Sequence, residues 1–268
     1  MIDWSLVVLC LLTGAINLIG ALAYAARIAG VRTRRIAMSF ALFNVLVLVS
    51  RLSNSFLAPL AAKRVENGIF SGEGAHLLGD FRWIMASATL GVLVGILLVP
   101  TFQRLFSSAI GAMQKKPSLA RLALRSVSPS GFLTIRQSIA PPRIERLHRM
   151  TRPKEASWGI LVANALAQAL LAVGVFASLY AGYLGPDFRV TASQLSAVIN
   201  GFATILLFVF IDPQLSGLTD DVVDGTMSEA AYRRVVVWIS LSRLAGTVLA
   251  QAAFVPAAVM IAWIAARI

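Results

Sequence analysis

The sequence is poor in charged residues and has almost no cysteine or histidine. Charged side chains make up 13% of the 268 residues and hydrophobic side chains 58%, whereas a soluble domain has about 25% charged residues. This balance excludes a soluble globular domain and predicts an all-α integral membrane protein that crosses the bilayer several times. The single cysteine, Cys10, excludes an intramolecular disulfide.

Motifs that bind nucleotides or metal ions are also missing. The sequence has no Walker loop, no Rossmann glycine pattern and no zinc-type Cys/His cluster, so we expect no cofactor and no metal site. "DVVDG", from Asp221 to Gly225, matches the opening of the CDP-alcohol phosphotransferase motif. The later aspartates that would complete its two-metal site are absent, and we therefore do not expect an enzyme of that family.

Long stretches without Asp, Glu, Lys or Arg predict about six transmembrane helices, because a span needs about 20 apolar residues. The expected spans are residues 4–26, 36–62, 83–103, 156–184, 190–211 and 235–266. Together they form one membrane domain, 1–268, with a long basic loop at 104–155 between the third and fourth helices. The residues preceding the first span lack a signal-peptide pattern, so we expect that span to be retained. Residues 71–79 leave open a short re-entrant or interfacial helix.

The distribution of Lys and Arg predicts the orientation, because cytoplasmic connections are enriched in basic residues. The first, third and fifth connections hold seventeen basic residues, and the opposite side holds five. We therefore expect the odd-numbered connections in the cytoplasm and both termini outside. The basic loop predicts contact with anionic lipids of the inner leaflet, although a plain positive-inside loop explains it equally well. It has almost no aromatic residues and no recognisable binding motif, which argues against nucleic acid as a partner.

Two arginines interrupt the predicted spans, at positions 51 and 243. Arginine stays charged, and at a helix centre it costs roughly 3 kcal/mol on insertion scales, so each needs a polar environment. Polar residues lie nearby at helical spacing, which favours a cavity that binds phosphate oxygens. Pairing with a carboxylate such as Asp80 or Asp212, or snorkelling to the lipid headgroups, is the alternative. The expected cavity residues are Arg51, Arg243, Ser50, Asn54 and Thr247.

Two further groups of charges flank the spans. Lys63, Arg64 and Arg82 are expected at the outer face, where they either anchor the helices or bind a ligand. The fifth connection carries the main cluster of acids, and a solvated, salt-bridged loop is one interpretation of it. Coupling or gating is the other, with Asp212, Asp220, Asp221 and Asp224 as candidates.

The order of several segments resembles the Amj family, the bacterial lipid II flippase group named as the alternate to MurJ. These segments are "ALAYAARIAGVRTRR" (21–35), "SFALFNVLVLVSRLSN" (39–54), "APL" (58–60), "DFRW…ATLG" (80–91), "PTF" (100–102), "SRLAGTVLAQ" (242–251) and the acidic "DP…TDDVVDG" segment. The similarity covers nearly the whole chain, apart from the central basic loop and residues 156–193.

The resemblance implies translocation of undecaprenyl-pyrophosphate-linked peptidoglycan precursor, lipid II, from the inner to the outer leaflet of the bacterial cytoplasmic membrane. It implies a multi-pass transport protein of cell-wall synthesis, not an enzyme. Six spans are few for so large a head group, which favours a homodimer or spans arranged as an open V. Two alternatives stay open: a non-transporting scaffold for envelope assembly, and an integral-membrane enzyme acting on polyprenyl phosphates.

Overall fold

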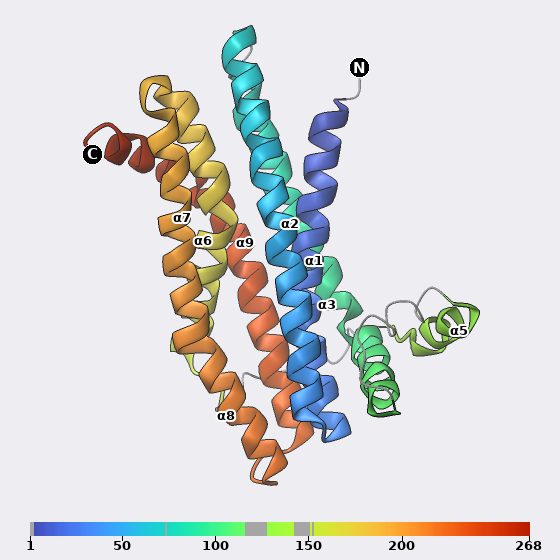
Figure 1. Cartoon of the computed structure of the whole chain (residues 1–268). Coiled ribbons are helices and arrows are strands. Elements are labelled where there is room, and N and C mark those ends of the chain that lie inside the picture. The colour runs from blue at the N-terminus through green and yellow to red at the C-terminus, as the bar shows by residue number, and fades with distance from the viewer. Residues whose placement is uncertain (1–2, 73, 116–127, 142–150, 152) are drawn as a thin grey trace.

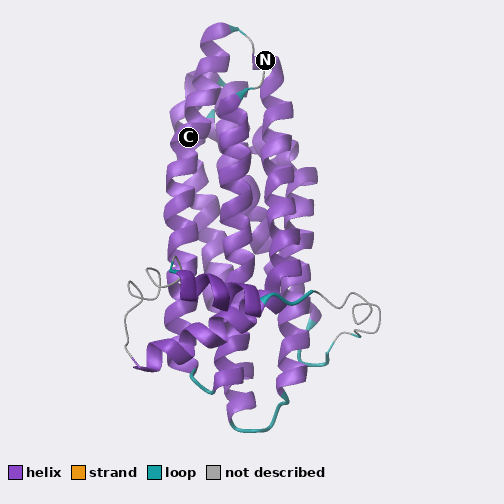
Figure 2. Cartoon of the chain, turned by 90° about the vertical axis from the view of Figure 1, so that its right-hand side faces the viewer, coloured by secondary structure: helices purple, strands orange, loops and turns teal. Residues whose placement is uncertain are grey.

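The computed structural model describes residues 3–72, 74–115, 128–141, 151 and 153–268. Within these ranges the chain is a bundle of long helices joined by loops and short turns, with no strand (Figure 2). Six helical stretches are long and apolar enough to cross a membrane: Trp4–Thr33, Ile36–Ser71, Gly74–Met113, Trp158–Leu184, Pro186–Val223 and Glu229–Ala265. The prediction of about six spans in an all-helical chain is therefore confirmed.

The first half of the bundle consists of α1 (Trp4–Thr33), α2 (Ile36–Ser71) and α3 (Leu77–Lys115), with α1 packed against both others. Gly72 ends α2 with a left-handed φ of 70°, a conformation that costs glycine nothing. A single 3₁₀ turn, η1 (Gly74–His76), then leads directly into α3. The described part of residues 71–79 thus contains a turn and no separate re-entrant helix.

The second half consists of α6 (Trp158–Leu184), α7 (Arg189–Ile205) and α9 (Glu229–Ala265), and α6 packs against both others. Serine N-caps start two of them, because the hydroxyls of Ser157 and Ser228 accept backbone N–H groups of the first turn. A 3₁₀ turn, η3 (Pro186–Phe188), connects α6 to α7. The chain termini lie at one end of the bundle (Figure 1).

Glycines let the helices of each half approach closely. A Cβ atom on Gly91 of α3 would collide with the carbonyl oxygen of Gly14 on α1, and one on Gly246 of α9 would collide with the carbonyl oxygen of Ala165 on α6. Small residues at such crossings are the usual device for tight helix packing in membranes. Close helix packing at a glycine is therefore found at both crossings.

Helix α7 does not stop at the end of the predicted fifth span. It continues through a π-helical turn, η4 (Leu206–Ile211), into α8 (Asp212–Val223), so part of the acidic connection is helical. At the same end of the bundle lies α5 (Pro129–Ser138), which crosses beside the end of α3 (Figure 1). The Thr101 hydroxyl and the backbone of Ala140 bond to each other, which fastens the α5 segment to α3.

Two separate apolar cores occupy the bundle. The lower core lies at the α5 and α8 end and includes Ile28, Phe106, Tyr232 and Ile239. The upper core lies at the end of the termini and includes Phe81 and Phe254, together with other residues from the opposite halves of the same helices. The segments that separate the two cores carry polar residues and line a cavity.

Candidate anion-binding cavity

A cavity of about 350 Å³ lies between the two halves of the bundle. Its wall takes residues from α1, α2, α3, α6, α7, η4, α8 and α9, so it needs both halves. About half of its lining residues have polar side chains: Thr13, Asn17, Tyr24, Asn44, Ser50, Arg51, Asn54, Ser55, Gln168, Asn200, Asp212 and Arg243. Such a wall is suited to an ionic or hydrated ligand within an otherwise apolar bundle.

Arg51 reaches the cavity from α2. The Ser50 hydroxyl donates to the carbonyl oxygen of Ile16 on α1 over 3.2 Å, which fixes this part of α2 against α1. The guanidinium of Arg51 contacts the other half of the bundle, with Nη1 3.5 Å from the Thr204 hydroxyl and Cζ 5.4 Å from the Phe208 ring centroid. Among the described residues it forms no ion pair within 4.0 Å, so its charge is available to a ligand.

Arg243 reaches the same cavity from α9. Next to it, the amide of Asn164 donates to the Ser242 hydroxyl over 2.7 Å and to the Ile239 carbonyl over 3.0 Å, which fixes α9 against α6. The guanidinium lies against Gly20 of α1, near the Tyr24 hydroxyl. Within the described part of the chain it has no acidic partner, and its buried Nε has no hydrogen-bond partner. Arg243 is therefore a half-buried cation without a carboxylate partner, which suits an anionic ligand.

We expect Gly20→Ala to displace the Arg243 side chain. The new Cβ would stand 2.5 Å from Nη2 and 3.1 Å from Cζ, and the end of a flexible side chain moves more easily than a helix. Binding of an anion in the cavity should fall while the unfolding temperature in detergent stays unchanged or rises slightly, because alanine favours helix over glycine by about 0.8–1.0 kcal/mol. Gly201→Ala, whose Cβ meets open space, is the control. A clear loss of stability in Gly20→Ala would contradict this explanation.

A third arginine, Arg27 of α1, lies behind the cavity wall. It is 3% exposed, and its Nη2 is 2.8 Å from Oδ1 of Asp212, which itself lines the cavity. The guanidinium also packs 4.4 Å and 4.9 Å from the ring centroids of Phe43 and Phe40. Two of its nitrogens, Nε and Nη1, have no partner among the described residues. One aspartate therefore faces three arginines in and around the cavity, which leaves the region net positive.

The π-helical turn brings Asp212 to the cavity. The backbone N–H of Asp212 bonds to the carbonyl of Leu207, five residues back, and Pro213 follows in the first turn of α8. A proline ring collides with the preceding turn of an α-helix, and a wider turn accommodates it. Single π turns inside long helices are frequent at functional sites.

Other predicted site residues lie elsewhere. Ser50 and Asn54 line the cavity as expected, but Thr247 does not: its buried hydroxyl donates to the carbonyl of Leu244 in its own helix. Of the four candidate coupling residues, only Asp212 lines the cavity. Asp220, Asp221 and Asp224 are exposed, as is Arg82. The described residues hold no cluster of three metal-ligating side chains.

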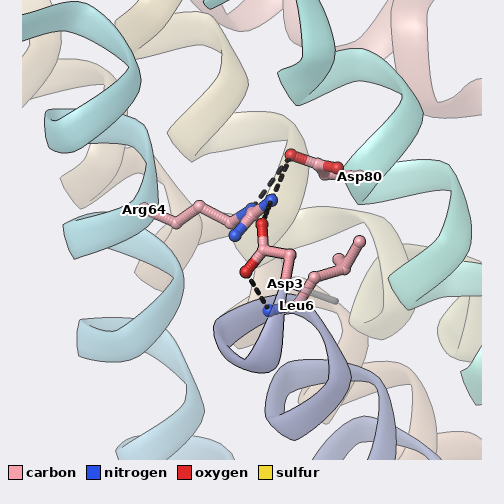
Figure 3. Close-up of polar contacts among 4 residues, drawn as sticks. All are labelled: Asp3, Leu6, Arg64 and Asp80. Atoms are coloured by element: carbon pink, nitrogen blue, oxygen red, sulfur yellow. Dashed lines mark hydrogen bonds and ion pairs between the residues drawn. The ribbon is translucent and has the colours of Figure 1, made fainter. Parts of the chain in front are cut away.

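Arg64 forms an ion cluster at the end of the bundle where the termini lie (Figure 3). Its Nη2 is 2.6 Å from Asp3 and 2.7 Å from Asp80, so it joins the start of α1 and the start of α3 to α2. The bond from Arg64 lowers the pKa of the Asp3 carboxyl. The stabilisation from the Asp3 contact is therefore present above the ordinary aspartate pKa and is lost as the pH falls through the lowered value.

We expect Arg64→Ala to destabilise the protein and the neighbouring Lys63→Ala to leave it nearly unchanged. Arg64 is 14% exposed and bonds to two carboxylates, so its loss should cost on the order of 2 kcal/mol. Lys63 is 69% exposed and lies 3.7 Å from Glu66, a surface pair worth about 0–1 kcal/mol. Thermal unfolding in detergent measures both. Equal losses would contradict the structural role assigned to Arg64.

The sequence did not reveal several residues of this site. The charge pattern groups Arg27 with the arginines of the first connection. In the structure it lies within α1, in a stretch of buried alanines. Gln168 and Asn200 are uncharged amide residues within predicted spans, and Asn200 Oδ1 is buried without a partner among the described residues. Amide side chains within a span are a usable signal for a cavity.

Fold and site together define a class: a six-span membrane protein with a net-positive cavity between two apolar cores. The chain belongs to the Amj family, described as "Alternate to MurJ", whose profile matches residues 12–265. It is 37% identical over 255 residues to a Bacillus subtilis (strain 168) protein named lipid II flippase Amj, an alignment that covers 93% of this chain and 92% of the relative. No solved structure matches the chain.

Proposed function

We propose that this protein is a lipid II flippase of the bacterial cytoplasmic membrane, which moves undecaprenyl-pyrophosphate-linked peptidoglycan precursor from the inner to the outer leaflet. Membership of the Amj family and the flippase name of the Bacillus subtilis relative support this function. The structural observation that carries it is the cavity between the two cores, with Arg51 and Arg243 in its wall and no acid paired with either among the described residues. The protein acts as a transporter and not as an enzyme.

The two cavity arginines bind the pyrophosphate. A guanidinium group offers two parallel N–H donors to phosphate oxygens, and such charge-assisted bonds are about twice as strong as neutral ones. Ser50 and Asn54 of α2 supply further polar groups beside Arg51. A buried pyrophosphate also supplies the anionic partner that Arg243 lacks within the described chain. The first candidate for coupling transport to an energy source is Asp212, because its carboxylate shares the cavity with these arginines.

The cavity accommodates the phosphates but not the whole head group. Pockets of about 300–1,000 Å³ hold drug-sized ligands, and this one, at about 350 Å³, is at the lower end. Two sugars and a pentapeptide require either a wider state of the bundle or a surface supplied by a second copy. A homodimer is therefore part of the proposal.

In the proposed orientation, the α5 and α8 end faces the cytoplasm and both termini face outward. The basic residues of the odd-numbered connections support this choice, and the same residues attract anionic lipids of the inner leaflet. The exposed apolar side chains of Leu133 and Ile139, in and just after α5, suit contact with that leaflet.

Rescue of bacteria depleted of their main lipid II flippase tests the function. Expression of the wild-type chain is expected to restore growth, and labelled lipid II should become accessible from outside the cell. A wild-type protein that reaches the membrane but restores neither would overturn the proposal and would favour a scaffold role. Loss of rescue in Asp220→Ala, Asp221→Ala or Asp224→Ala, with normal function of Arg51→Ala and Arg243→Ala, would instead favour an enzyme.

A further inference from the structure

The cavity has a mouth on one side of the bundle. Four residues both line the cavity and are exposed on the surface: Asn44, Arg51 and Ser55 of α2, and Phe208 of η4. The three α2 residues are seven and four positions apart, so they lie on one face of that helix. The cavity therefore reaches the surface between α2 and the segment formed by α7 and η4.

The way the helices pack explains why the mouth is there. In Figure 1, α2 and α7 belong to opposite halves, and α9 is visible between them. Each packs on its own neighbour, α2 on α1 and α7 on α6. Within each half, glycine contacts bring backbones together, at Gly14–Gly91 and at Ala165–Gly246. The boundary between α2 and α7 lacks such a crossing in the described chain.

The side chain of Arg51 bridges the mouth. Arg51 extends from α2 to the Thr204 hydroxyl and the Phe208 ring on the other edge. The 3.5 Å separation from Thr204 is at the outer limit of a hydrogen bond, so an anionic ligand would compete successfully for this guanidinium. Beside the mouth, both edges are apolar and exposed, with Leu52 and Phe56 on α2 and Ile205 on α7.

We propose that a polyprenyl chain passes from the cavity into the bilayer between α2 and the α7–η4 segment, while its pyrophosphate is held inside by Arg51 and Arg243. This inference rests on the proposed function and adds the place where the lipid tail lies. The tail is apolar and stays in the hydrocarbon phase, and the phosphates need the arginines. The mouth places the hydrocarbon phase next to the polar cavity, because Arg51 lines the cavity and is also exposed on the surface.

Site-specific photo-crosslinking tests the route with two matched pairs of positions. In η4, Phe208 lines the cavity and Phe210 does not, although the two are 48% and 52% exposed. In α2, the neighbours Ser55 and Phe56 are both exposed, and only Ser55 lines the cavity. The variants are Phe208→p-benzoylphenylalanine, Phe210→p-benzoylphenylalanine and the corresponding changes at Ser55 and Phe56. The probe is radiolabelled undecaprenyl pyrophosphate in vesicles that contain the full-length protein.

We expect several-fold more labelled lipid at position 208 than at 210, and at 55 than at 56. A labelled phosphatidylglycerol should mark the positions of each pair equally. Equal labelling by the polyprenyl probe in both pairs would overturn the route, and so would the same preference shown by phosphatidylglycerol. If one variant does not fold, the other pair gives the same comparison. Rescue by the wild-type chain, measured separately, distinguishes a wrong route from a wrong function.

Discussion

Replacing Arg243 with alanine is expected to abolish rescue of cells that depend on this protein. The change removes a half-buried cation from the cavity wall, and the substrate's pyrophosphate loses a charge-assisted contact. Truncating one partner of a buried, hydrogen-bonded charge pair costs about 2–5 kcal/mol of binding, enough to stop growth when transport is limiting. Growth at matched membrane levels is the measurement, supported by the rate at which lipid II appears outside.

Stability should not fall in this variant. Within the described chain Arg243 has no acidic partner and its Nε has no hydrogen-bond partner, so alanine removes a half-buried charge that no carboxylate compensates. The unfolding temperature in detergent is expected to stay the same or to rise. If Arg243→Ala lowers it strongly, the residue supports the fold instead of binding an anion.

Two further variants define what Arg243 contributes. Arg243→Lys keeps the charge but loses the planar fork that binds two phosphate oxygens at once, so it should restore growth only weakly. Arg233→Ala removes an exposed arginine from the same helix and outside the cavity, and normal growth is expected. Full growth with Arg243→Lys would mean that charge alone is sufficient, and it would contradict the proposed bidentate contact.

The helices and one part of the cavity were predictable from the sequence, for a physical reason. A membrane span must be long and apolar, so a lone arginine such as Arg51 or Arg243 stands out against it. The exact ends of the helices were less predictable. The helices continue past the apolar runs, as α9 does by starting at Glu229 behind the Ser228 cap, because helix formation does not need an apolar environment.

Contacts between distant helices were the part that sequence spacing could not give. Asp80 and Asp212 were considered as partners for the intramembrane arginines, and both do form ion pairs. Their partners are Arg64 and Arg27, which the charge pattern assigned to loops. Thr247 has helical spacing from Arg243, but its hydroxyl turns to its own backbone. Pairing of this kind depends on how helices rotate against each other, which the period of one helix does not determine.

The second large effect is expected from the Arg27–Asp212 pair. Either Arg27→Met or Asp212→Leu leaves one buried or half-buried charge without its partner, and breaking such a pair costs about 3–5 kcal/mol. Asp212→Leu should be the more destabilising of the two, because it leaves Arg27 without a partner. The Arg27 side chain is 3% exposed and lies between two aromatic rings. We expect both single variants to unfold at clearly lower temperature in detergent.

The double variant, Arg27→Met with Asp212→Leu, separates the stabilising role of the pair from a role in transport. Replacing both members of a buried ion pair with apolar residues is often neutral or stabilising, so its unfolding temperature should return close to that of the wild type. If growth also returns, the pair only holds α1 to α8 and Asp212 does not couple transport to an energy source. If stability returns but growth does not, the carboxylate in the cavity is needed for transport.

A double variant as unstable as the singles would show that the charges interact with groups other than each other. Arg51 would then be the first to examine, because it shares the cavity with Asp212.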